Sequence, residues 1–528
     1  MARTLMSGML VVLLSTLGGN GVARADAAPA DTDTASRLEA DLNAGSCQPF
    51  ATFSVPLRCQ WQGQIRVTPV GDHYQAEIPE VVAFIGSGRQ IALGTLLLDL
   101  RPESNGALAF SLTLPSALLL AGKEGTPEVN VSTGSQTVSG HWEPATHSVT
   151  QVTTNLHDLR VASPTAPYTI RIGTVALNET LAETQPGRWG GSASLTLGSL
   201  AVQTADGGEL LHLGSVTLDG GVTGLDIALA IARRAQSLAA AAEAAPVAGA
   251  TPPQSAAAAA KKGLVTTARH YLERAHDLFD GASVGIHFTD LRVKLPMVET
   301  IISLGKFDYQ TAVTGLEQGK STLTVVYGHG PLAVTPEPTL NDFLPKSARF
   351  SLTASGLPND DLWQALNRVL PPDSHGSEQV IKTLLTEADA ALTKAGAHLT
   401  IESFNIDTPA TTVNMTGQAQ YDAAATMGMV AECNMIIRGF DVALKAMQPA
   451  PGAIGMSDET KNILSALTML QVMGLPAKDE AGRDARTYKV QVANTGGIML
   501  NGADITILVQ SLRDRLGHHS QPPAGGAR

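Results

Sequence analysis

Aromatic and charged residues are both scarce in this 528-residue chain. Phe, Trp and Tyr make up 4% of the sequence, and Asp, Glu, Lys and Arg make up 16%. Acidic residues outnumber basic ones, which gives a formal net charge of −12, and no basic cluster is present. An acidic chain without a basic patch is poorly suited to bind a nucleic-acid backbone. The shortage of aromatic rings also argues against a cleft that stacks sugars.

Cysteine is rare as well, with three residues in the chain. Cys47 and Cys59 stand in a Pro-containing stretch, where a disulfide would close a short loop and fix the N-terminal segment. We predict that these two residues pair. Cys433 is left over, and an unpaired cysteine is most often a small buried apolar residue.

Long apolar runs are missing after the N-terminus. The first 25 residues have Arg3, an apolar run over 5–17 and the pair Ala23-x-Ala25, which together predict a secretory signal with the mature chain beginning near Asp26. That run is too short to cross a hydrocarbon core of about 30 Å, and no later segment reaches the roughly 20 apolar residues that a membrane helix needs. We therefore expect a periplasmic protein whose mature chain has no integral membrane span.

Motifs of enzymes and metal sites are also missing. The sequence has no His-Glu-x-x-His, no Gly-x-Ser-x-Gly and no phosphate-binding glycine loop. Ser303 and Lys306 fit Ser-x-x-Lys by letter, but they lie within an alternating strand pattern. Asp360 and Asp361 are typical of a helix start, where carboxylates interact favourably with the macrodipole. We predict no catalytic residue, no metal and no cofactor. The sequence leaves open one alternative, a pair of carboxylates across a cleft as in glycoside hydrolysis.

Alternation with period 2 is the main signal that is present. Leu108, Phe110, Leu112 and Leu114 alternate with polar or small residues, which is typical of a strand with one face toward a core. Similar patterns recur between residues 61 and 222, separated by turn clusters such as 101–106. Short strands with turn signals between them predict an antiparallel arrangement.

A repeated break in that alternation predicts curvature. Residues 158–188 align without a gap on 290–320 and share several identities, including Asp158-Leu-Arg-Val with Asp290-Leu-Arg-Val and Gly173 with Gly305. The apolar positions there and near residue 400 follow a two-three-two spacing: Ile286, Phe288, Leu291 and Val293, and again Leu399, Ile401, Phe404 and Ile406. One extra residue in an alternating strand is the signature of a β-bulge, which bends the strand.

Three similar units interrupt the strands with pairs of amphipathic helices. Each begins after a strand that ends in Gly-Leu or Gly-Phe, at Gly224, Gly356 and Gly439. In the first unit a Pro, Ala and Ser-rich linker over 246–257 separates the two helices, and it is typical of a flexible segment. The apolar helix stripes need a surface to cover, and a sheet provides one.

These observations predict an α+β, mostly β fold with a long curved antiparallel sheet and repeated strand-helix-helix-strand units. The predicted divisions are a signal peptide at 1–25, an N-terminal segment with the disulfide at 26–60, an antiparallel β region at 61–222, a helix pair plus β repeat at 223–355, a second at 356–438, a third at 439–510 and a disordered tail at 511–528.

Several segments carry a family resemblance. The strand over 348–352 that enters Ser-Gly-Leu-Pro at 355–358, together with the closing segments 488–492 and 497–502, resembles uncharacterised Gram-negative envelope proteins of the YdgA-like and AsmA-like type, among them an alphaproteobacterial domain-of-unknown-function family. The likeness extends loosely over 60–510. It implies a periplasmic location and a long curved sheet, and it transfers no catalytic residue. Members of those families often keep an N-terminal membrane anchor, whereas cleavage is expected here.

Two non-enzymatic functions follow from this pattern. In the first, a concave apolar sheet face binds or transfers lipid, with Ile286, Phe288, Leu399 and Ile401 as apolar groove candidates. The alternative arrangement is that the helices fill the concavity and leave no groove. In the second function, the repeats form an envelope assembly factor or scaffold that acts through protein–protein contacts. The ligand, the partner and the oligomeric state do not follow from the sequence.

Overall fold

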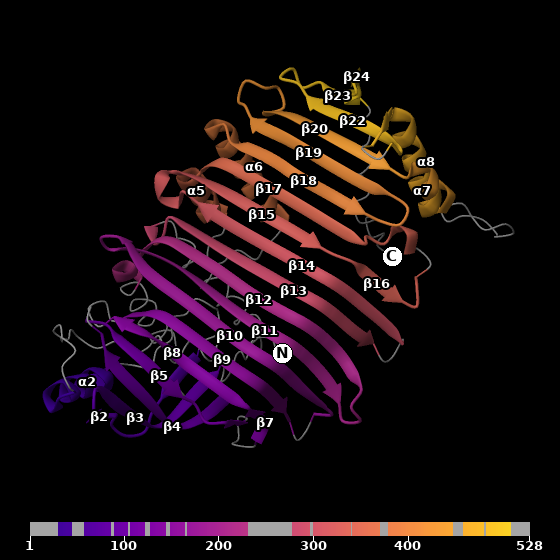
Figure 1. Cartoon of the computed structure of the whole chain (residues 1–528). Coiled ribbons are helices and arrows are strands. Elements are labelled where there is room, and N and C mark those ends of the chain that lie inside the picture. Colours follow the sequence, from indigo (N-terminus) through magenta and orange to yellow (C-terminus); the bar gives the residue numbers. More distant parts are fainter. Residues whose placement is uncertain are drawn as a thin grey trace, which may run out of the picture. The chain divides into compact units, whose positions relative to one another are not determined.

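The computed structural model describes thirteen stretches of the chain (Figure 1), which are 30–44, 57–85, 89–103, 106–121, 127–143, 148–163, 166–230, 277–295, 299–338, 341–369, 378–446, 458–479 and 482–507. The predicted signal peptide, Cys47, the linker over 246–257 and the tail over 511–528 lie outside these residues. Cys59 lies in a described strand, but its side chain does not belong to the described part.

The chain divides into two compact units. Unit 1 comprises Met1–Ile227, Ser283–Phe307 and Val334–Pro336, and unit 2 comprises Ala228–Ala282, Asp308–Ala333 and Glu337–Arg528. The domain boundaries predicted from the sequence rest on its composition and repeats, and they stay predictions.

The described elements of unit 1 are helix α2 and a series of antiparallel strands. In chain order its elements are α2 (Thr32–Ala44), β1 (Leu57–Gln60), β2 (Arg66–Val70), β3 (His73–Ile85), β4 (Arg89–Pro102), β5 (Leu108–Thr113), β6 (Ala117–Ala121), β7 (Pro127–Ser132), β8 (Ser135–Glu143), β9 (Ser148–Ala162), β10 (Tyr168–Gln185), β11 (Arg188–Thr204), β12 (Glu209–Asp226) and β13 (Gly281–Leu295). Strands β13, β14 (Thr300–Thr314) and β16 (Leu332–Thr335) contain residues of both units; of β13, the first two residues belong to unit 2.

Unit 2 alternates strands with helices. Its elements are the short 3-10 turns η3 (Leu316–Gln318) and η4 (Asn341–Phe343), strands β15 (Lys320–His329), β17 (Ser347–Pro358), β18 (His398–Asp407), β19 (Thr412–Tyr421), β20 (Met429–Arg438), β21 (Leu475–Lys478), β22 (Asp484–Val492), β23 (Ile498–Leu500) and β24 (Ala503–Asp504), and helices α5 (Asn359–Val369), α6 (Glu378–Ala395), α7 (Phe440–Ala446) and α8 (Asp458–Met473). The described chain is therefore mostly β and antiparallel, as the sequence predicted.

The main core lies in unit 1, where the sheet closes on itself. Strand β4 pairs with β5 along one part of its length and with β6 along another, and the two branches meet again at β9, which pairs with both β8 and β7. The core is composed of aliphatic residues that are almost fully buried, among them Leu93, Leu96, Leu98, Leu100 and Val138.

Helix α2 covers one edge of this core and was not predicted. Asp31 caps its start by accepting a hydrogen bond from the Thr34 amide at 2.8 Å. At its other end the Asn43 amide both donates to the Ile65 carbonyl and accepts from the Ile65 amide, each at 2.9 Å. Leu38 and Leu42 are buried on the core side. The helix thus satisfies backbone groups beside β2 while it buries its own apolar stripe.

A row of left-handed residues crosses β9 to β13. Asp158, Ser199 and Asp290 have φ values of +52°, +53° and +51°. Ser199 and Asp290 each lie against a glycine of a neighbouring strand, and Asp158 lies against Gly134 in the turn between β7 and β8. A Cβ atom added to Gly173 would be 3.1 Å from Ser199 Cβ, and one added to Gly214 would be 3.1 Å from Asp290 Cβ. Only a residue without a side chain fits opposite these positions without displacing its neighbour.

The left-handed row also changes the side-chain alternation. The strand positions on both sides of it pair in register, for example Leu156 with Val175 and Leu159 with Ile172, so residues three apart face the same side. In β18 the two-three-two spacing coincides with a register shift between Ile401 and Phe404, which is the predicted bulge.

We predict that Ser199→Val lowers the free energy of unfolding by about 1–2 kcal/mol, because a β-branched residue tolerates the left-handed region poorly. Ser199 is exposed, so little packing is lost. Ser199→Gly is the matched control and should be at least as stable as the wild type. Urea denaturation followed by circular dichroism measures both. Equal stability of the valine variant and the wild type would contradict the strain at this position.

Asp479 fixes the connection between β21 and β22. Its carboxylate accepts hydrogen bonds from Arg438 Nη1, from the Arg483 amide and from Arg483 Nε, each at 2.8 Å. The backbone hydrogen bond from Arg483 and the two guanidinium groups hold the pKa of this carboxyl well below its usual range. The contact joins β20 to the turn that precedes β22.

This arrangement gives a second prediction. Because the folded-state pKa of Asp479 is depressed, its contribution to stability is present at neutral pH and is lost as the pH falls below the usual Asp value of about 3.9. Asp479→Asn should lower the thermal midpoint at pH 7, and the difference from the wild type should shrink on acidification. Asp484→Asn, in a side chain that is 86% exposed, should have little effect. A pH-independent difference for Asp479→Asn would exclude the ionic explanation.

Candidate functional site

Strands β9 to β12 of unit 1 place apolar side chains directly opposite one another on one face. Four consecutive rows can be followed across the strands from β9 to β12: Val161, Ile170, Val202 and Leu211; Leu159, Ile172, Leu200 and Leu213; Leu156, Val175, Leu197 and Val216; Thr154, Leu177, Leu195 and Leu218. Cross-strand pairs of this kind are the unit of sheet stabilisation. We call this surface the unit 1 apolar face.

Burial decreases along these rows. In β10 the side chains of Ile172, Val175 and Leu177 are 1%, 6% and 3% exposed and belong to the main core. In β12 only Leu213 is buried to a similar degree, and its apolar neighbours in the rows are half-buried. The side chains of these rows therefore become less buried from β9 to β12, and the rows extend beyond the main core.

Ile286 and Phe288 extend this face onto β13. His287 Nε2 lies 2.9 Å from Asp219 Oδ1 of β12, and Thr289 hydrogen-bonds Ser215 at 2.9 Å. Because side chains alternate along a strand, Ile286 and Phe288 point to the side opposite to these polar contacts, which is the apolar side. Phe288 stacks on Phe307 with ring centroids 4.6 Å apart. Both groove candidates of β13 are half-buried.

Unit 2 has an apolar face of its own, which carries Leu399 and Ile401. Three rows run across its strands from β15 to β22: Tyr327, Phe350, Phe404, Met415, Met435 and Tyr488; Val325, Leu352, Ile401, Gly417, Cys433 and Val490; Leu323, Ala354, Leu399, Ala419, Ala431 and Val492. Phe350 and Phe404 meet edge to face at a centroid distance of 6.2 Å. We call this surface the unit 2 apolar face.

Most of the unit 2 apolar face is half-buried. Among its row members Tyr488 is 2% exposed, whereas Leu323 is 37% exposed and most others lie between these values. The core cluster of this unit is small and lies at one end, around Ile437, Phe440, Tyr488 and Leu500. The middle rows are therefore apolar without being enclosed to the degree seen in unit 1.

The opposite face of the unit 2 strands is polar. One row there reads Thr324, Thr353, Thr400, Gln418, Glu432 and Gln491. Glu402 accepts hydrogen bonds from Ser351 and Thr353 at 3.0 and 2.9 Å, and Glu432 pairs with Lys489 at 3.2 Å. Hydrogen bonds from Lys489 and Gln491 lower the pKa of Glu432. Polar side chains of this face hydrogen-bond one another across the strands.

Helix pairs stand at the two ends of the unit 2 strands. Helices α5 and α6 connect β17 to β18, and α7 and α8 lie between β20 and β21, at the other end of the strands (Figure 1). Burial, together with the Asp389 carboxylate of α6, raises the pKa of Tyr421, whose strand position places it on the apolar side. Leu467 and Met473 of α8 pack on the Ile437 and Tyr488 cluster. Both helix pairs thus border the unit 2 apolar face.

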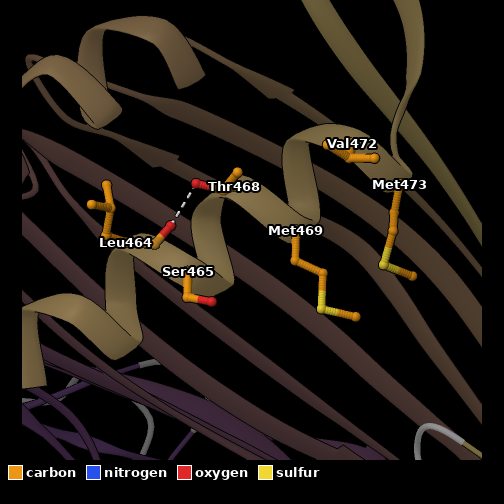
Figure 2. A pocket seen from close by; sticks show the side chains of 6 residues that line it. All are labelled: Leu464, Ser465, Thr468, Met469, Val472 and Met473. Atoms are coloured by element: carbon orange, nitrogen blue, oxygen red, sulfur yellow. Dashed lines mark hydrogen bonds between the residues drawn. The ribbon is translucent and has the colours of Figure 1, made fainter. Parts of the chain in front are cut away.

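Helix α8 adds an open apolar wall. A shallow pocket of about 590 Å³ is lined by Leu464, Ser465, Thr468, Met469, Val472 and Met473, all on one helix face (Figure 2). Met469 and Val472 are 43% and 79% exposed. Figure 2 shows Met469 and Met473 pointing to the same side of the helix. Met473 also packs on the core cluster, so the pocket adjoins the closed end of the apolar face.

Reactive groups are sparse among the residues that the structure describes. No group of three or more His, Cys, Asp or Glu in the described stretches is arranged to hold a metal ion. Cys433 is free and half-buried in an apolar row, and burial raises the pKa of its thiol. Ser303 and Lys306 lie in β14, and Asp361 at the start of α5 pairs with Lys394 at 3.0 Å. The helices within the described stretches are each too short or too polar to cross a bilayer.

The four groove candidates are distributed over both apolar faces, with Ile286 and Phe288 in unit 1 and Leu399 and Ile401 in unit 2. The aromatic row of Tyr327 and its partners was not predicted from the sequence, although period-2 alternation in each strand indicates its members. The second apolar stripe of α8 was not predicted either. Comparison with family models, with curated proteins and with solved structures found no match.

We predict that Tyr488→Phe weakens the attachment of α8. The Tyr488 hydroxyl donates to the Leu470 carbonyl at 2.6 Å, and a hydrogen bond of this kind contributes about 1 kcal/mol. The variant should lose about that amount in urea denaturation and should show faster hydrogen exchange over residues 464–473. Tyr168→Phe, at a side chain that is 47% exposed, serves as the control. Unchanged exchange in α8 would show that packing alone holds the helix.

Proposed function

We propose that the protein is a non-enzymatic periplasmic protein that binds, or transfers, lipid by holding acyl chains on its apolar sheet faces. The observation that carries this proposal is the set of apolar cross-strand rows, half-buried on one side of strands whose other side is polar. Ile286, Phe288, Leu399 and Ile401 each belong to such a face.

The chain leaves the apolar surface of these faces incompletely buried. Burial of apolar surface stabilises a protein by roughly 25 cal/mol per Å², and extended exposed apolar surfaces mark sites of interaction. An acyl chain is apolar, linear and flexible, so it can lie along a row and complete the burial of several side chains. The methionines Met415, Met435, Met469 and Met473 favour such a ligand, since unbranched thioether side chains adapt to irregular shapes.

The finer features of the fold belong to the same proposal. We propose that the sheet is curved and that the helix pairs are repeated units, as the resemblance to YdgA-like and AsmA-like envelope proteins implies. The left-handed row and the bulge at Ile401 support curvature, because both increase bending and twist. The pairs α5 with α6 and α7 with α8 support two of the three units, and the helices of the third lie largely outside the described residues.

Export to the periplasm is proposed from the N-terminal sequence alone, because residues 1–25 and the partner of Cys59 are outside the described part. The proposed disulfide between Cys47 and Cys59 is part of this assignment.

An envelope scaffold is the second candidate, and one observation favours it. Several helical apolar side chains are exposed, with Leu385 of α6 at 64%, Val442 of α7 at 54% and Val472 of α8 at 79%. Such residues suit contact with another protein as well as contact with lipid. In that case the sheet faces would carry no extractable ligand.

The central test is lipid extraction from protein purified out of a periplasm, followed by mass spectrometry of the organic phase. Wild-type protein should yield acyl species. Ile401→Asp places a charge on the unit 2 apolar face and should reduce their recovery severalfold. Thr400→Asp is the matched control, because it places the same charge one residue earlier, on the polar face, and should leave recovery unchanged.

Folding of each variant is checked by its thermal midpoint, and Ile401→Gln provides a milder version of the change if the aspartate variant unfolds. Equal recovery from Ile401 and Thr400 variants would remove the unit 2 face from the proposal. A wild-type extract without acyl species, from protein never exposed to detergent, would favour the scaffold.

A further inference from the structure

One carboxylate lies on the unit 1 apolar face. Glu179 of β10 stands opposite Val152 of β9 and opposite Ala193 of β11. Along its own strand the nearest residues on the same face are Leu177, which is 3% exposed, and Leu181, which is half-buried. Glu179 is thus the next row after the four apolar rows, and its immediate neighbours are aliphatic.

Within the described stretches of the chain, this carboxylate has no counter-charge. Among the described residues it makes no hydrogen bond and no ion pair, and burial raises its pKa. The facing positions of β9 and β11 carry Val152, Thr154, Ala193 and Leu195, none of which is charged. The closest charged residue on the same side of β10 is Glu183, whose carboxylate accepts a hydrogen bond from the Gly187 amide at 2.7 Å. An unpaired carboxylate in such surroundings is costly.

A second unpartnered polar group lies beside it. Thr154 stands opposite Leu177, one position along the face and therefore diagonal to Glu179. Its side chain is fully buried, and no described residue hydrogen-bonds its hydroxyl oxygen. Diagonal positions on one face of an antiparallel pair are close enough for long side chains or a shared ligand group to reach both. Unsatisfied buried groups are rare in folded proteins, so the Thr154 hydroxyl, next to the half-buried Glu179 carboxylate, needs an explanation.

We propose that Glu179 is the head-group contact of the unit 1 apolar face and that it pairs with the primary ammonium group of an amphiphile. This inference rests on the proposed function, since the half-buried part of the four apolar rows, on β11 and β12, would hold the acyl chain. The ammonium supplies the missing counter-charge, and its three N–H donors can satisfy both the Glu179 carboxylate and the Thr154 hydroxyl.

The surroundings distinguish the head groups. A quaternary ammonium has no N–H donor and is normally held by aromatic faces, but the residues around Glu179 are Val152, Ala193, Leu177 and Leu181. A carboxylate head group would meet Glu179 with the same charge. A primary amine is therefore selected by both its charge and its hydrogen-bond donors.

Binding of three twelve-carbon probes to the full mature chain tests this inference. Dodecylammonium, dodecyltrimethylammonium and dodecanoate are compared below their micellar concentrations at pH 7 by isothermal titration calorimetry. Wild-type protein should bind dodecylammonium at least tenfold more tightly than either other probe. Glu179→Gln should abolish this preference while leaving dodecanoate binding equal or stronger. Glu183→Gln, which removes a carboxylate four residues further along β10, should keep the preference.

The stability of the free protein provides a second measurement. Because the folded-state pKa of Glu179 is raised, the wild type should lose stability as the pH rises from the unfolded-state value toward and through the folded-state value. Glu179→Gln should remove that loss, and saturating dodecylammonium should offset it in the wild type only.

The outcomes separate this inference from the proposed function. Equal affinities for the three probes, or a preference that survives Glu179→Gln, would overturn the role of Glu179 while leaving acyl binding intact. If no probe binds and no lipid is extracted from the wild type, the proposed function fails, and the head-group assignment fails with it.

Discussion

The antiparallel register between long strands determines everything else in this protein. When two strands pair in register, residues directly opposite one another share a face, and a strand of 18 residues such as β10 carries many such pairs. Rows of like side chains then extend across several strands without any helix to organise them. Both apolar faces are products of this pairing, and the polar rows behind them follow from the same alternation.

Along each of the two apolar faces, the side chains at one end are more fully buried than those at the other. Where strands branch and rejoin around β4 and β9, side chains such as Leu96 and Leu98 are sealed. Where α8 packs through Leu467 and Met473, a small cluster is sealed in unit 2. Away from these sealed regions, the side chains of each apolar face contact neighbours on their own sheet but are only half-buried. A polar residue such as Glu179 is tolerated only at the margin of a sealed region.

The sequence predicted the composition of the strands better than their partners. Alternation in Leu108 to Leu114 and the two-three-two spacing near Ile401 are local patterns, and local geometry reproduces them. The pairing of Phe350 with Phe404, or of Thr154 with Leu177, depends on which strands become neighbours, and no single-strand pattern contains that choice. Helix α2 was missed although Asp31 is a typical cap, and the isolation of Glu179 is visible only after three strands are placed side by side.

The left-handed row has a consequence for how the strands find their register. On either side of the left-handed row, a shift by two residues keeps the apolar side chains on their own face, so hydrophobic alternation alone does not oppose it there. Such a shift would move Gly173 away from Ser199, or Gly214 away from Asp290. A residue with a side chain would then face the left-handed residue, at a position where only glycine fits. The glycines thus discriminate among registers that the apolar pattern treats as equivalent. During folding, these glycines would favour the native register over registers shifted by two residues.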